Sequence, residues 1–105
     1  MKRYSRTFKT NLVWVEDTDL KLVQDTYVFN QDFLNESGID EYIGKDFWGI
    51  RCNMRNRAFP NTLVKDEYGI HFDDELMENV HYFVLKEKDD TEEYIINNFH
   101  VYGLY

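Results

Sequence analysis

A two-residue alternation at positions 47–54 constrains the fold of this sequence more than any other feature. Apolar side chains occupy every second position of the run, namely Trp48, Ile50, Cys52 and Met54. Because successive side chains of a β-strand point to opposite faces, this period predicts a strand with an apolar face. Cys52 lies on that face between Ile50 and Met54, so we expect it to be a buried core residue.

Other runs rich in β-branched and aromatic residues predict further strands. They indicate a buried strand at 12–15, a turn at 16–19 and a return strand within 20–29. The only proline lies in a predicted loop at 56–61, and a short strand follows at 62–65. The short connections favour an antiparallel sheet.

A hairpin turn is predicted at Asp66–Gly69, where the glycine supplies a positive φ. Tyr68, Ile70 and Phe72 then share one face of the chain, and His71 lies on the opposite face. The turn also puts two acidic residues at the tip of the hairpin, where their side chains project into solvent.

The stretch at 73–88 fits a helix and a strand equally well. Of the two, we expect a helical turn at 73–78 and a strand from about 80 to 87. Residues 86–92 are polar and predict a turn. Residues 93–102 then predict a last strand, antiparallel to the one before it.

Residues 30–44 break the strand pattern and predict two short helical turns. Asn30 caps the first turn and Gly38 ends it, whereas Asp40 caps the second and Gly44 ends it. The predicted fold class is therefore α+β: a twisted antiparallel β-sheet of about five to seven strands with one or two short helices.

The composition supports a single folded domain spanning residues 1–105. The 8 Phe, 8 Tyr and 2 Trp residues supply a large apolar area for a chain of this length. The single cysteine cannot form an internal disulfide, and the basic N-terminal residues are not followed by the apolar stretch of a signal peptide. No apolar run approaches the roughly 20 residues of a membrane helix. We therefore expect a cytoplasmic protein without membrane contacts.

No motif in the sequence points to catalysis or to a cofactor. The glycines are too sparse for a phosphate-binding loop, and nothing marks a pair among the 20 acidic residues as an acid–base couple. The best local metal cluster is His71 with Asp73 and Asp74, where we favour an exposed histidine beside a helix-capping aspartate. A nucleophilic pair of Cys52 with a histidine conflicts with the apolar position of Cys52. We expect no enzymatic activity, no metal and no cofactor.

One basic and aromatic cluster is a candidate surface for single-stranded nucleic acid, because arginine and aromatic side chains stack on bases. It comprises Arg51, Arg55, Arg57, Lys65, Trp48 and Phe59. However, the formal net charge of −8 opposes phosphate backbones. We therefore favour salt bridges to neighbouring acids and expect no direct binding of nucleic acid.

The densest charge cluster is acidic and lies at residues 66–78, which we call the acidic segment. Six acids fall within it without a base, interleaved with Tyr68 and Phe72: Asp66, Glu67, Asp73, Asp74, Glu75 and Glu78. Acids also suit a helix N-terminus, so capping is one interpretation of Asp73–Glu75. The other is a partner-binding surface made of the six acids and Tyr68, for which the acids at 16–19 are the alternative.

Small size, acidity and the missing chemistry together favour an inhibitor-type binding protein of the immunity protein or antitoxin class. It would occlude the basic active site of a nuclease toxin by protein–protein contact. Carboxylates would steer association with the positive cleft, and aromatic side chains would anchor the complex. The alternative is a phage-encoded anti-defence protein that mimics nucleic acid and inhibits a restriction or CRISPR effector. A small enzyme or enzyme subunit is a third and less supported class.

Overall fold

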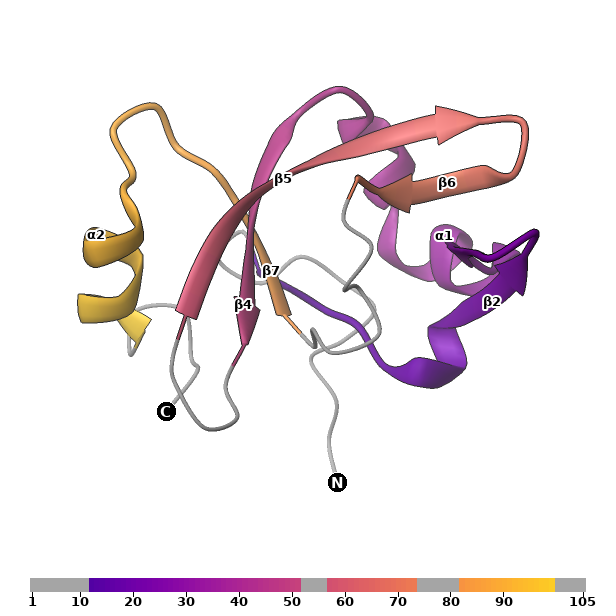
Figure 1. Cartoon of the computed structure of the whole chain (residues 1–105), viewed down its shortest axis with the longest axis horizontal. Helices are drawn as coiled ribbons and strands as arrows, with labels where there is room; N and C mark the ends of the chain where they lie inside the picture. Colours follow the sequence, from indigo (N-terminus) through magenta and orange to yellow (C-terminus); the bar gives the residue numbers. More distant parts are fainter. Residues whose placement is uncertain (1–11, 52–56, 74–81, 100–105) are drawn as a thin grey trace.

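Residues 47–51 of the alternating run lie in the central strand of an antiparallel sheet in the computed structural model, which describes residues 12–51, 57–73 and 82–99 (Figure 1). The strands of this sheet are β1 (Leu12–Trp14), β4 (Asp46–Arg51), β5 (Arg57–Asp66), β6 (Gly69–Phe72) and β7 (Tyr82–Leu85). Their order is β1-β7-β4-β5-β6, and every neighbouring pair is antiparallel. With a second, two-stranded sheet and two short helices, the predicted α+β fold is confirmed.

Both faces of β4 are buried, which explains its central place in the sheet. Trp48 and Ile50 share one face, as predicted, and pack with Ile95 and Phe99 near the C-terminal end of the described residues. Phe47 points the other way and belongs to a second, larger apolar cluster. The abundant aromatic residues thus fill two cores, one on each face of the sheet. The prediction for Cys52 falls outside the described residues.

The two short helical turns predicted between residues 30 and 44 are confirmed. They are α1 (Gln31–Ser37) and the 3₁₀ turn η2 (Ile39–Tyr42). The Asn30 side chain accepts a hydrogen bond from the Phe33 backbone N–H at 2.9 Å, and Gly38 ends α1 with a φ of 67°. Asp40, however, lies inside η2 and does not cap it.

Residues 20–29 form a hairpin of their own, so the prediction of one return strand was wrong. The hairpin consists of β2 (Leu20–Val23) and β3 (Thr26–Phe29), which form the second sheet. Its two-residue turn, Gln24 and Asp25, has φ values of 49° and 68°. Tight hairpins favour such a turn, although glycine is its usual signal. The predicted turn at 16–19 is the 3₁₀ turn η1 (Asp17–Asp19), and β1 pairs with β7 instead of β2.

The predicted loop around Pro60 was also wrong, because β5 runs through it. Pro60 pairs with Trp48 of β4 on one side. On the other side, β6 pairs with β5 only from Leu63 to Asp66, so no strand of the described residues flanks Pro60 there. A proline is tolerated in a strand where its missing N–H is not needed by a neighbour.

The C-terminal strand predicted at 93–102 is instead a helix in its described part, α2 (Glu92–Asn97). The Thr91 hydroxyl oxygen accepts a hydrogen bond from the Tyr94 backbone N–H at 3.2 Å. Buried Ile95 and Phe99 are four residues apart, the spacing of one helix face. The predicted strand at 80–87 is confirmed by β7, whereas the helical turn at 73–78 lies outside the described residues except for Asp73. No described helix has the length and apolar character to cross a membrane.

Candidate functional site

The first part of the acidic segment lies at the tip of the β5–β6 hairpin, as predicted. Asp66 pairs with Gly69, which has a φ of 138°, and Glu67 and Tyr68 form the two-residue turn between them. Figure 1 shows this hairpin extending away from β4 and β7, on the side of α1 and β2. A Cβ atom on Gly69 would lie 3.3 Å from Val28 of β3, so the hairpin rests closely on the two-stranded sheet.

The Asp66 carboxylate forms hydrogen bonds that hold this tip together. Its Oδ1 accepts hydrogen bonds from the backbone N–H groups of Tyr68, at 2.9 Å, and Gly69, at 3.3 Å. Its Oδ2 lies 2.8 Å from Nε2 of His71. The hydrogen bond from His71 is the main cause that holds the pKa of the Asp66 carboxyl below its usual value. Asp66 therefore fixes the turn and has little bonding capacity left for a partner.

Asp66, Glu67 and Tyr68 are all exposed at the tip, and of the three Glu67 and Tyr68 have side chains that do not build the turn. Both are exposed, and Tyr68 is among the large apolar side chains most open to solvent, at 36% exposure. Because Asp66 holds the backbone N–H groups of Tyr68 and Gly69, these two side chains project from a defined turn. The arrangement offers a carboxylate and a phenol ring to a macromolecular surface.

Asp73, the described residue in the second part of the acidic segment, is separated from the tip. Asp73 follows β6, and the four residues of β6 span roughly 13 Å at ~3.3 Å per residue. The Asp73 backbone N–H donates to the Thr62 carbonyl oxygen at 2.9 Å. Its side chain borders a polar cleft of about 190 Å³ lined by Asp46, Pro60, Asn61, Thr62, Asp73 and Lys86. The predictions for Asp74, Glu75 and Glu78 lie outside the described residues.

The alternative acids near the N-terminal end do not form an equivalent surface. Asp17 is exposed, but Asp19 is completely buried. The Asp19 Oδ2 accepts a hydrogen bond from the Glu16 backbone N–H at 2.9 Å, and the Asn30 backbone N–H donates to the Asp19 carbonyl oxygen at 3.0 Å. Asp19 therefore ties η1 to the start of α1 and is not accessible to a partner.

The sheet separates the members of the basic and aromatic cluster. Arg51 and Arg57 are cross-strand neighbours, and the Arg51 guanidinium carbon lies 5.2 Å from the centre of the Phe59 ring. Trp48 points to the opposite face, is 5% exposed and lies under the Lys86 ammonium group.

The other basic residues of that cluster do not form a surface on which nucleic-acid bases could stack. Arg57 lies 3.8 Å from the carboxylate of Glu92, which agrees with the predicted salt-bridge role. Lys65 pairs with Ile70 near the far end of β5, and Arg55 lies outside the described residues. A base could therefore not stack on Trp48 and Phe59 together.

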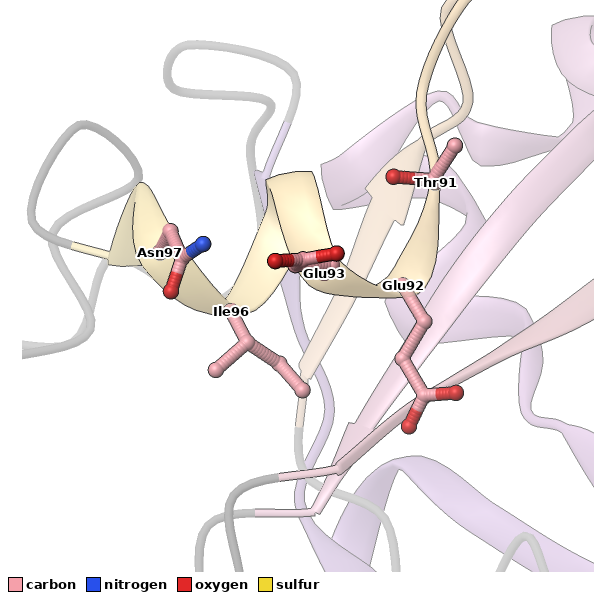
Figure 2. Close-up of a pocket in the computed structure, with 5 residues that line it drawn as sticks. All are labelled: Thr91, Glu92, Glu93, Ile96 and Asn97. Carbon is pink, nitrogen blue, oxygen red and sulfur yellow. The ribbon is translucent and has the colours of Figure 1, made fainter.

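Sequence reasoning missed a second acidic surface, which α2 presents (Figure 2). An open concavity of about 570 Å³ runs along the helix and is lined by Thr91, Glu92, Glu93, Ile96 and Asn97. Tyr94, on the same helix, is 50% exposed. The strand predicted at 93–102 hid this surface, although a threonine followed by two glutamates is a signal for a helix start.

The described residues form no metal-binding site. They contain no group of three or more His, Cys, Asp or Glu side chains placed to hold a metal ion. His71 does not join Asp73, as the metal cluster that the sequence disfavoured would have required; its ring contacts Asp66 and the carbonyl oxygen of Phe72. Its side chain is 12% exposed, so the prediction of an exposed histidine was wrong. The exposed turn at the β5–β6 tip therefore remains the candidate site among the described residues.

Comparison with known proteins does not extend this description. No protein-family model, no curated protein and no solved structure matches the chain.

Proposed function

We propose that this protein is an acidic inhibitor-type binding protein of the immunity protein or antitoxin class, acting in the cytoplasm. It would bind a nuclease toxin and occlude the basic active site of that enzyme. The observation that carries the proposal is the ordered β5–β6 tip, which exposes Glu67 and Tyr68 on a chain with a formal net charge of −8.

The order of the tip supports a binding role. A contact loop that is already fixed loses less conformational entropy on binding than a flexible one. Here the Asp66 carboxylate holds two backbone N–H groups of the turn, and Gly69 packs against Val28. Glu67 and Tyr68 would thus meet a partner without a large ordering cost.

The charge of the chain supports a basic partner. A nuclease cleft is positive because it holds phosphates, so a molecule of net charge −8 is attracted to it over several ångströms. Rim carboxylates such as Glu67 would accelerate association, and a partly desolvated ring such as Tyr68 would slow dissociation. The same field argues against duplex nucleic acid as the partner.

The experiment that tests this function is capture of the partner from native lysate, followed by mass spectrometry and a nuclease assay. We expect a basic nuclease that the protein inhibits at equimolar concentration. Glu67→Gln combined with Tyr68→Ala should weaken capture. Glu41→Gln, which removes the same charge from an exposed position of η2, is the matched control and should capture normally.

Two results would contradict the proposal. Recovery of a restriction or CRISPR effector would identify the protein as a phage-type anti-defence protein instead. Capture of the same nuclease by the tip variant and the control in equal amounts would move the contact away from the β5–β6 tip.

A further inference from the structure

Both ring nitrogens of His71 face oxygen atoms that can only accept hydrogen bonds. Nε2 lies 2.8 Å from Oδ2 of Asp66, and Nδ1 lies 3.0 Å from the carbonyl oxygen of Phe72. The carbonyl oxygen never carries a proton. The Asp66 carboxylate already accepts two backbone N–H groups through Oδ1, and its lowered pKa keeps it ionised.

A neutral imidazole has one N–H group and can satisfy only one of these two acceptors. The imidazolium form has two N–H groups and satisfies both. We propose that the β5–β6 hairpin is a proton-dependent latch, in which both acceptors of His71 are satisfied only while the ring carries a proton on each nitrogen. The latch is a property of the hairpin itself and does not depend on the identity of a partner.

The charged and titratable groups near the latch come from the strands that pack on β6. Those of the part of β5 that pairs with β6 (63–66), the turn, β3 and the residue after β6 are Lys65, Asp66, Glu67, Tyr68, Tyr27 and Asp73. Lys65 pairs with Ile70 and so belongs to the opposite face of the hairpin from His71. Val64, the direct cross-strand neighbour of His71, is apolar. Asp66 is thus the acidic group, among the described residues, whose side chain contacts the ring.

Loss of the second proton would act directly on the tip. If Nδ1 keeps its proton for the Phe72 carbonyl oxygen, Nε2 presents a lone pair to the Asp66 carboxylate, and the two repel. The carboxylate must then move or recruit water. Its Oδ1 holds the turn through Tyr68 and Gly69, so the movement loosens the turn that presents Glu67 and Tyr68. A proton equilibrium at a side chain that is 12% exposed would in this way control the order of an exposed surface.

The test is an NMR titration of the whole chain, which needs no partner. The ¹⁵N shifts of the His71 ring report protonation of each nitrogen, and the amide shifts of Tyr68 and Gly69 report the turn. We expect both ring nitrogens to be protonated at the acidic end of the titration. As the pH rises, the two amides should move with the same midpoint as the ring.

His71→Gln provides the second measurement, because its amide group donates a hydrogen bond at every pH. In this variant the Tyr68 and Gly69 amides should not titrate over that range. His100→Gln, which changes a histidine remote in sequence, should leave their titration as in the wild type. Amides that stay still while His71 loses a proton, or that titrate unchanged in His71→Gln, would overturn the proposal.

Discussion

Gly49 lies in the middle of β4, and its replacement by alanine tests the packing of the central sheet. Phe59, its cross-strand neighbour, lays its ring over the glycine. A Cβ atom at position 49 would lie 2.5 Å and 2.7 Å from two atoms of that ring. Ordinary contact begins at 3.4 Å, so the ring would have to withdraw by roughly 0.9 Å. The Arg51 guanidinium group, 5.2 Å from the ring centre, would have to move with it.

The expected effect of Gly49→Ala is a net loss of stability. Overpacking of this kind costs about 1–3 kcal/mol. The lower entropy of the unfolded alanine chain offsets about 0.4–1 kcal/mol of that loss, since Gly49 does not have a positive φ. Urea unfolding should therefore show a decrease of up to about 2.6 kcal/mol in the free energy of unfolding.

A Phe59→Ala background separates the clash from other effects. When the Phe59 ring is absent, Gly49→Ala causes no clash and only lowers the entropy of the unfolded chain. The substitution should then be neutral or slightly stabilising. A double-mutant cycle measures this reversal of sign. If Gly49→Ala costs the same with and without Phe59, the proposed contact does not explain the glycine.

Three further predictions follow from other parts of the molecule. Thr91→Ala removes the cap of α2 and should lower the free energy of unfolding by about 1 kcal/mol in urea, whereas Thr91→Ser should retain most of it. The folded pKa of Asp66 is lowered, so its stabilising contribution is present above about pH 4 and is lost as the pH falls through that lowered pKa. Asp66→Asn should therefore flatten the acid limb of a stability–pH profile, and an unchanged limb would contradict the assignment. Because the net charge is −8 and the two faces of the sheet separate Trp48 from Phe59, a gel shift should detect no duplex DNA or RNA binding at physiological salt. Micromolar binding would be the contrary result.

The correctly predicted elements are those in which the side-chain pattern, caps and glycines favour the same structure as the packing of the folded protein. The alternation around Trp48 and Ile50 marks the central strand because both residues are buried on one side of it. The Asn30 cap and the glycine at 38 mark α1, and Gly69 marks the hairpin. In each of these cases, side-chain spacing or backbone chemistry determines the local structure by itself.

The errors have identifiable physical causes. A proline usually indicates a loop. Pro60 is tolerated in β5 because β6 does not pair with that part of the strand, and the sequence alone does not show where the pairing ends. Gln24 and Asp25 form a tight turn without glycine, so the hairpin of 20–29 lacked its usual signal. At α2, the apolar residues from Tyr94 to Phe99 favour a strand by composition, whereas the Thr91 cap and the burial of Ile95 favour the helix.

The position of the candidate site was predictable from the sequence, but only some of its contacts were. An exposed acidic turn followed from the sequence at 66–69. The pairing of Asp66 with His71 did not, because it requires the register of β5 and β6, which places the two side chains on one face of the hairpin. Asp73 was grouped with the tip by sequence proximity, yet the length of β6 separates them.

The measurement that tests the central claim most directly is the association rate with the captured partner at two salt concentrations. The wild type should associate more slowly at high salt, as expected for electrostatic steering. Glu67→Gln should associate more slowly than the wild type at low salt and should depend less on salt, with the fold intact. The Glu41→Gln control should behave like the wild type. If Glu67→Gln retains both the rate and the salt dependence of the wild type, the β5–β6 tip is solvated surface and the proposed binding site is wrong.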